Sequence, residues 1–184
     1  MFIKNKLESM KKISKLGLNK FPEQLFKVGE QEKVREFLTC YPAQYYAIRD
    51  KSKAGGIFKL KVAANDVFAE INHYDLFTIN VSSANYVENQ LLVGEIQILS
   101  NGEVYATLSV DQTASVRDAL RNPTFNLKTD IFDKKLNKIP HFDLIYEYII
   151  THNLQNVIVE FALFDQEVGI RKERIIVYEL RTHY

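Results

Sequence analysis

The 184 residues of this chain suit one domain, or one domain with two lobes. Apolar residues make up 46% and charged residues 26%, close to the globular average, which excludes disorder as a description of the whole chain. The 24 Lys and Arg against 23 Asp and Glu leave a net charge of +1. The chain therefore lacks the basic excess with which a general nucleic-acid binder neutralises phosphates.

No stretch of the sequence approaches the ~20 consecutive apolar residues that span a bilayer. The basic N-terminus is not followed by the apolar run of a signal peptide, so we expect a cytoplasmic protein without a membrane partner. The single cysteine, Cys40, excludes an internal disulfide and a multi-cysteine metal site. We interpret Cys40 as a small buried hydrophobic residue at the apolar end of a helix.

The first half of the chain predicts a tail, a helix and three strands. Residues 1–20 are rich in lysine and are expected to form an N-terminal tail. Residues 22–41 repeat apolar side chains at helical spacing, with a weak point at Gly29 and an end at Pro42. Period-two alternation and a capping signal predict strands at residues 45–49, 58–62 and 76–81 and a short helix at residues 66–71.

The second half predicts mainly hairpins. Asn101-Gly102 lies between two apolar runs, which is a strong signal for a tight turn between antiparallel strands. A helix is expected to begin at Pro140 and to end near His152, and a shorter one carries Arg117 and Arg121. The remaining strands are expected at residues 90–99, 103–110, 125–132, 157–164 and 175–181.

Hairpins outnumber strand–helix–strand crossovers in this order of elements. The sequence therefore predicts an α+β fold of mostly antiparallel sheets with flanking helices. We expect one domain over residues 21–184, which can divide into two lobes.

The closing hairpin carries charges inside apolar strands. Glu160 interrupts the run VIVEFALF, and Glu179 and Arg181 interrupt IIVYELR. Glu179 and Arg181 are two residues apart and share a face, with Glu160 able to lie opposite them. Two carboxylates and an arginine on one face could hold Mg²⁺ and a triphosphate. The structural alternative is a Glu–Arg ion pair on an exposed sheet face.

A second set of charges surrounds a pair of glycines. The basic residues Arg49, Lys51, Lys53, Lys59 and Lys61 flank Gly55-Gly56, and alternation puts the last two on one face of a strand. Glycines let backbone N–H groups approach an anion, and lysines neutralise its charge. The alternative is an ordinary solvated hairpin loop.

Glu95 follows Gly94 inside the apolar run LLVGEIQIL. A glycine in a strand marks either a close approach of another group to the backbone or a bulge. The more familiar catalytic signatures, including the P-loop, G-x-S-x-G, H-E-x-x-H and G-x-G-x-x-G, are absent, and the four histidines lack ligand spacing.

The order of these clusters resembles the ATP-grasp arrangement, in which ATP lies between two antiparallel sheets. Within that group, VEFALF and IIVYELRT are similar to the end of the ATP-binding domain of phosphoenolpyruvate synthase and pyruvate phosphate dikinase. The similarity covers about residues 42–182. The dikinases carry Arg-Ser-Ser where this chain has Arg49-Asp50-Lys51-Ser52, and the resemblance does not extend to the mobile phosphohistidine domain of those enzymes.

The resemblance implies ATP and Mg²⁺ as cofactors and an ATP-dependent phosphotransferase or ligase-like activity. Glu160 and Glu179 would be metal ligands, and Glu95 would lie near the nucleotide. Phosphate or nucleotide contacts would come from Arg49, Lys51, Lys59, Lys61 and Arg181.

The expected partners are a nucleotide and either a protein or a small-molecule phosphoryl acceptor. One alternative is a non-enzymatic domain that binds another anionic ligand or a protein partner. A weaker alternative is a local RNA contact through the lysine loop with Tyr45 and Tyr46, which the near-neutral charge argues against.

Overall fold

The computed structural model describes residues 3, 6–52 and 56–182, and their contacts divide the chain into two compact units. One unit comprises Met1–Lys20 and Glu88–Tyr184, and the other comprises Phe21–Val87. Each unit contains one antiparallel sheet with helices, so the predicted α+β class is confirmed. Among the described residues, no helix combines the length and apolar character needed to cross a membrane.

The larger unit is built on a five-stranded sheet in which every neighbouring pair is antiparallel. The predicted Asn-Gly hairpin joins its β5 and β6, and the closing hairpin joins β8 and β9. In spatial order the strands are β7 (Phe125–Asp130), β6 (Glu103–Ser109), β5 (Gln90–Ile98), β8 (Ile158–Val168) and β9 (Glu173–Arg181).

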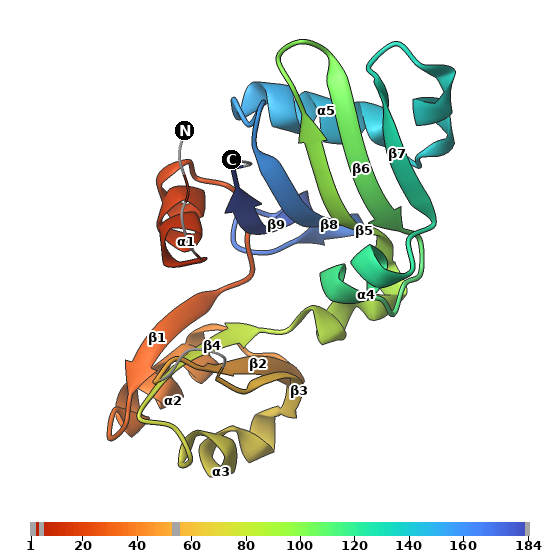
Figure 1. The fold of residues 1–184 in the computed structure, drawn as a ribbon. Helices are drawn as coiled ribbons and strands as arrows, with labels where there is room; N and C mark the ends of the chain where they lie inside the picture. Colours follow the sequence, from red (N-terminus) through yellow and green to blue (C-terminus); the bar gives the residue numbers. More distant parts are fainter. Residues whose placement is uncertain (1–2, 4–5, 53–55, 183–184) are drawn as a thin grey trace. The chain divides into compact units, whose positions relative to one another are not determined.

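One face of this sheet forms the main hydrophobic core. Helix α5 (Phe142–Thr151) lies across that face, and α1 (Lys6–Lys15) packs beside β9 (Figure 1). α5 contributes Ile145 and Ile149, each at most 2% exposed. Two shorter elements, η3 (Lys134–Lys138) and α4 (Val116–Arg121), complete the unit.

The segment that we expected to be an N-terminal tail contributes to this core. Ile13 is 2% exposed, because the amphipathic α1 buries its apolar side against β9, and Leu18, just after the helix, is 1% exposed in the same core. Asn19 is fully buried, and its amide nitrogen donates to the carbonyls of Val168, Glu173 and Ile175 at 2.9–3.2 Å. This side chain therefore joins the N-terminal segment to the turn between β8 and β9.

The opposite face of the five-stranded sheet changes from apolar to charged along the strands. The adjacent strands β5, β8 and β9 present three consecutive rows of cross-strand neighbours on this face. The apolar row is Val93, Ala162 and Ile176; the next is Glu95, Glu160 and Glu179; the last is Gln97, Ile158 and Arg181. α4 contacts β5, β6 and β8, and its Ala119 is fully buried.

Gly94 marks a close approach between two strands rather than a site for a ligand. Its φ of +149° lies where side-chain-bearing residues are strained. A Cβ atom there would lie 2.2 Å from the carbonyl oxygen of Thr107 in β6. Only glycine lets β5 and β6 pair at this point.

The smaller unit has a four-stranded antiparallel sheet in the spatial order β1 (Glu23–Lys27), β4 (Leu76–Val81), β2 (Tyr45–Asp50) and β3 (Phe58–Ala63). Its helices α2 (Gln31–Cys40) and α3 (Val67–Ile71) lie on one face (Figure 1). They bury Val34, Phe37, Val67 and Ile71 together with Phe26 and Phe77 of the sheet. η1 (Ala64–Asp66) precedes α3, and η2 (Ser83–Asn89) leads to β5.

Two local predictions for this unit are wrong. The predicted helix over residues 22–41 is a strand followed by a helix, because residues 23–27 pair with β4 and Gly29 turns the chain with a φ of +86°. Cys40 is exposed rather than buried, since Val34 and Phe37 form the buried side of α2. Its exposure follows from its place in the last turn of the helix.

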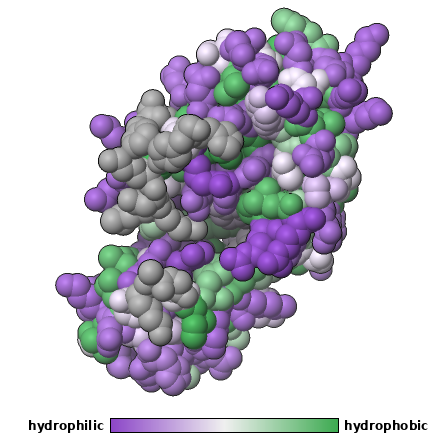
Figure 2. All heavy atoms as spheres, in the orientation of Figure 1, coloured by the Kyte–Doolittle hydropathy of each residue, from purple (hydrophilic) through white to green (hydrophobic). Residues whose placement is uncertain are grey.

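The surface of both units is mixed in polarity. In the view of Figure 2, hydrophilic side chains dominate and apolar side chains appear as separate patches. The exposed large apolar residues of the smaller unit include Leu25, Ile57 and Phe58, between 46% and 55% exposed. Scattered exposure of this kind is ordinary for a globular protein.

Replacing Gly94 by alanine should destabilise the larger unit by about 3 kcal/mol, because the new methyl group would overlap the β6 backbone. Gly102→Ala is the matched control. Gly102 also has a positive φ, of +93°, but its Cβ would meet nothing closer than 3.4 Å. Thermal and urea unfolding should show the larger loss for Gly94→Ala; equal losses would mean that backbone strain alone explains both.

Replacing Asn19 by alanine should cost about 2–4 kcal/mol, because buried carbonyls and the Arg171 N–H would lose their partner. Asn126→Ala on the exposed side of β7 should change the free energy of unfolding by less than about 0.5 kcal/mol. Urea unfolding of both variants measures the difference. A neutral Asn19→Ala would show that the N-terminal segment is held by its apolar contacts alone.

Candidate functional site

Three carboxylates lie side by side on the polar face of the five-stranded sheet. Glu95 pairs with Glu160 across β5 and β8, and Glu160 pairs with Glu179 across β8 and β9. We call Glu95, Glu160 and Glu179 the carboxylate row. The predicted position of Glu160 opposite Glu179 is confirmed. Directly opposed like charges repel, so this arrangement needs a compensating cation.

Arg181 supplies a positive charge to the carboxylate row. Its Nη2 atom lies 2.8 Å from Oε1 of Glu160 and also donates to Oε2 of Glu95. The Glu95 and Glu160 side chains are 26% and 17% exposed, whereas Arg181 is 41% exposed. The arginine therefore bridges two strands from a position open to solvent. The structural alternative of a Glu–Arg ion pair is thus present at Glu160, and the sequence contained no signal for the bond to Glu95.

A small hollow of about 30 Å³ adjoins the row. It is lined by Glu95 and Gln97 of β5, Tyr105 and Thr107 of β6, and Ile158 of β8. A space of this size holds one or two water molecules or a small ligating group, not a whole nucleotide. The sequence did not predict three of these residues at the site: Gln97, Tyr105 and Thr107. The pairing of β5 with β6 places Thr107 opposite Glu95 and Tyr105 opposite Gln97, and this register cannot be recognised in the sequence.

Two members of the carboxylate row are the predicted ligands of Mg²⁺. In the described part of the chain, no three His, Cys, Asp or Glu side chains are grouped as ligands of a metal. Mg²⁺ in nucleotide sites is commonly held by one or two carboxylates together with phosphate oxygens and water. Glu160 and Glu179, as cross-strand neighbours, fit such a two-carboxylate site.

In the smaller unit, Arg49 and Lys51 lie at the end of β2. The guanidinium carbon of Arg49 lies 4.4 Å from the ring centroid of Phe58, a cation–π contact that orients the side chain. The backbone N–H of Lys51 donates to the carbonyl of Leu76 at 2.7 Å. Gly56 approaches the backbone of Asp50, where a Cβ atom would lie 2.6 Å from the carbonyl oxygen. Lys53 lies outside the described residues.

Lys59 and Lys61 do not share a face, contrary to the prediction. Between the pairs Tyr46–Val62 and Ile48–Lys59, β3 advances three residues while β2 advances two. This bulge turns Lys59 toward Glu70 of α3, with a 2.7 Å ion pair, and leaves Lys61 over the ring of Tyr45, 4.6 Å from its centroid.

These contacts also bear on the RNA alternative. Tyr46 is 1% exposed and its hydroxyl donates to the carbonyl of Tyr41 at 2.8 Å. The ring of Tyr45 already carries Lys61. Tyr46 is therefore unavailable for stacking on a base, and the pair does not form the aromatic platform that we had considered.

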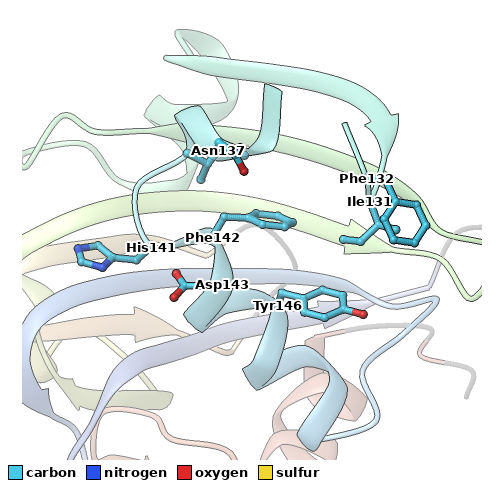
Figure 3. A pocket seen from close by; sticks show the side chains of 8 residues that line it. Ile131, Phe132, Asn137, His141, Phe142, Asp143 and Tyr146 are labelled. Carbon is cyan, nitrogen blue, oxygen red and sulfur yellow. The ribbon is translucent and has the colours of Figure 1, made fainter. Parts of the chain in front are cut away.

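A larger open hollow, of about 530 Å³, lies between η3 and the start of α5 and contains none of the predicted site residues. Figure 3 shows Ile131, Phe132 and Tyr146 at one end and His141 and Asp143 at the other. Phe132 is 91% exposed. The wall is mainly apolar and aromatic.

No family model matches this chain, and no curated protein matches its sequence. Solved structures do match. The macrocyclase MdnC of Microcystis aeruginosa, bound with the precursor peptide MdnA, aligns with 96% of this chain and 51% of its own, at a TM-score of 0.50 and 14% identity. The fold is ATP-grasp-like.

Two further structures are similar at lower scores. The VanG D-Ala:D-Ser ligase of Enterococcus faecalis aligns with 96% of this chain and 51% of its own, at a TM-score of 0.47 and 15% identity. The N5-carboxyaminoimidazole ribonucleotide synthetase of Thermotoga maritima aligns with 98% of this chain and 42% of its own, at a TM-score of 0.45 and 18% identity. The chain therefore spans about half the length of these enzymes. The finer resemblance to phosphoenolpyruvate synthase and pyruvate phosphate dikinase stays a prediction.

Lys59 forms an ion pair with Glu70, so replacing Lys59 should change the free energy of unfolding. Burial raises the pKa of Glu70, but hydrogen bonds from Lys59 and the Tyr74 hydroxyl outweigh it and hold the pKa below its ordinary value. A lowered carboxyl pKa stabilises the fold above the unfolded-state pKa and loses that effect as the pH falls through the folded-state value.

Lys59→Met should therefore lower the free energy of unfolding by up to about 1 kcal/mol above about pH 5, discounted because Lys59 is half exposed. The difference from wild type should shrink on acidification, as Glu70 becomes protonated. Lys61→Met, which breaks only a cation–π contact, is the control and should show no such pH dependence. Urea unfolding at a series of pH values measures both; a pH-independent loss in Lys59→Met would contradict the ion-pair account.

Proposed function

We propose that this chain is an ATP-binding domain that holds ATP together with Mg²⁺. The observation that carries the proposal is the carboxylate row with Arg181 on the polar face of the five-stranded sheet. Partly buried carboxylates in adjacent strands are unfavourable unless a cation compensates them. The ATP-grasp-like fold supports the choice of ATP as the ligand.

In this proposal the residues have separate roles. Glu160 and Glu179 contribute oxygen ligands to Mg²⁺, and Arg181 contacts phosphate oxygens. Glu95 holds Arg181. Mg²⁺, when bound, would neutralise the phosphates during phosphoryl transfer. For the smaller unit we propose phosphate contacts from Arg49, Lys51 and Lys61, whereas the ion pair of Lys59 with Glu70 makes it the weakest of the predicted contacts.

The proposed reaction class is ATP-dependent phosphoryl transfer or ligation. The macrocyclase with the similar fold is bound with a precursor peptide. We propose by extension that the acceptor is a carboxylate, carried by a small molecule or by a protein. The chain corresponds to about half of such an enzyme, so nucleotide binding is the part of the activity assigned to these residues.

A second candidate is a non-enzymatic domain that binds another anion or a protein partner. The observation that favours it is the pairing of Arg181 with two carboxylates, which compensates their charge without a metal. In that case the ion pairs serve stability, and metal and nucleotide have no effect on the protein.

Calorimetric titration should show that ATP binds more tightly with Mg²⁺ than without it. Glu160→Gln and Glu179→Gln should each weaken Mg·ATP binding by about tenfold or more, because each change keeps the shape of the side chain but removes a charge that the metal needs. The fold should remain intact in both variants. Glu103→Gln, at the start of β6 in the same unit, is the charge-matched control.

Melting curves of the same variants separate the two candidates. A purely structural role predicts that Glu160→Gln lowers the midpoint, since Arg181 loses a partner, while nucleotide has no effect on any variant. No heat of binding from folded wild-type protein with millimolar Mg·ATP would reject the nucleotide proposal. It would leave the non-enzymatic domain as the better account.

A further inference from the structure

The hollow between η3 and the start of α5 has a preformed aromatic wall. Its volume of about 530 Å³ lies within the range of ligand pockets in proteins. The rings of Phe142 and Tyr146 stack with their centroids 6.3 Å apart, and Ile131 and Ile139 also line the hollow. An apolar group that entered the hollow would therefore meet a surface that is already in place.

An exposed aromatic ring lies at the edge of the same hollow. Phe132, in the turn after β7, is 91% exposed, more than any other large apolar side chain in the described residues. Figure 3 shows it with Ile131 and Tyr146 at one end of the hollow. A solvated ring of this kind is unfavourable, because a phenylalanine side chain removes about 150–250 Å² from water when it is buried.

Backbone hydrogen bonds fix the position of Phe132. The N–H of Ile131 donates to the carbonyl of Gly102 at 2.8 Å. Asp130 accepts two further bonds at 2.9 Å, from the N–H of Phe132 to its Oδ1 atom and from the N–H of Asp133 to its carbonyl. The turn is therefore held at three consecutive residues, and the exposed ring is a defined projection of the surface.

The two sides of the hollow carry opposite charges. Residues 134–138, which form η3, contain three lysines and no acidic residue. Residues 139–152, which include α5, contain no Lys or Arg but carry Asp143 and Glu147, which are exposed and four residues apart on one helix face. Among the described residues, Lys134, Lys138, Asp143 and Glu147 form no ion pair. These charges are therefore available to a partner.

We propose that this surface is a two-fold interface between two copies of this chain, in which Phe132 of each copy enters the hollow of the other. A two-fold interface uses the same patch on both partners, so a projection and its receptacle must lie side by side on one surface. Phe132 and the hollow meet this requirement. In this arrangement the lysines of η3 face Asp143 and Glu147 of the other copy, and the opposite charges attract.

A second copy accounts for more of this surface than a small ligand does. A small molecule in the hollow would leave the ring of Phe132 and the unpaired charges in water. A second copy buries the ring, fills the hollow and pairs η3 with α5 through one symmetric contact. The hollow contains none of the residues assigned to ATP or Mg²⁺, so this inference does not depend on the proposed function.

The first test is sedimentation velocity with light scattering on the full chain, from about 1 µM to about 1 mM. Wild-type protein should form a dimer within this range and no larger species. Phe132→Ser should weaken the dimer at least about tenfold, because the ring is the central buried group of the interface. Val110→Ser is the matched control. Val110 is an apolar side chain of the same unit, is 41% exposed, does not line the hollow, and should leave the dimer unchanged.

The second test reverses the charges on one side of the hollow at a time. One variant combines Lys134→Glu with Lys138→Glu, and the other combines Asp143→Lys with Glu147→Lys. Each variant alone puts like charges opposite one another, so its self-association should weaken at least about tenfold. An equimolar mixture should restore the dimer, because each η3 then faces an α5 of opposite charge. Adding Phe132→Ser to both variants should abolish that heterodimer, which separates the specific contact from attraction between oppositely charged proteins.

Four results would overturn the inference. Wild-type protein that stays monomeric up to about 1 mM would show that a second copy does not bind this surface. A dimer that persists unchanged in Phe132→Ser would lie elsewhere on the molecule. Species larger than a dimer would show that the contact is not two-fold. A mixture of the charge variants that stays monomeric, or that associates equally with and without Phe132, would reject the pairing of η3 with α5. Circular dichroism and melting curves of each variant establish that it is folded.

Discussion

The architecture of the larger unit depends on the burial of one face of its five-stranded sheet against α1 and α5. Along β5, β8 and β9, alternate side chains pack beneath α1 and α5, so the intervening side chains must all project from the opposite face. A slip of one residue would move Glu160 into the core, where an unpaired carboxylate is strongly unfavourable. The apolar pattern that drives folding therefore also aligns Glu95, Glu160 and Glu179 in one row.

That alignment creates an electrostatic problem, and its solution defines the candidate site. Three carboxylates on neighbouring strands repel one another unless a cation lies among them. Arg181 provides the charge from the end of β9, in bonds to Glu95 and Glu160. The same bonds that compensate the carboxylates also occupy one of them.

The smaller unit shows how local context decides the use of a basic residue. Lys59 and Lys61 are equivalent in an alternating sequence, yet Glu70 of α3 engages the first and the ring of Tyr45 the second. Arg49 is oriented by Phe58 on the side of the sheet away from the helices. Arg49 and Lys61 therefore keep their charged groups outside the core of this unit, which is what a phosphate contact requires.

The sequence by itself determined most of the strands, the Asn-Gly hairpin, the helix that begins near Pro140 and the shared face of Glu160, Glu179 and Arg181. Period-two alternation and turn chemistry act locally and can be recognised in one sequence. The sequence did not determine the strand at residues 23–27, where pairing with β4 overrides a helical spacing of apolar residues. It also did not determine that Ile13 and Leu18 lie in the core. Only the tertiary structure decided the bulges, two of which lie beside predicted site residues. In β9 the pairing passes from Phe161–Val177 to Glu160–Glu179, so the extra residue, Tyr178, keeps Glu179 on the face of Glu160. In β3 the extra residue separates Lys59 from Lys61. A bulge depends on what each strand meets across the sheet and on the helices above it, and that information is distributed over residues far apart in the chain.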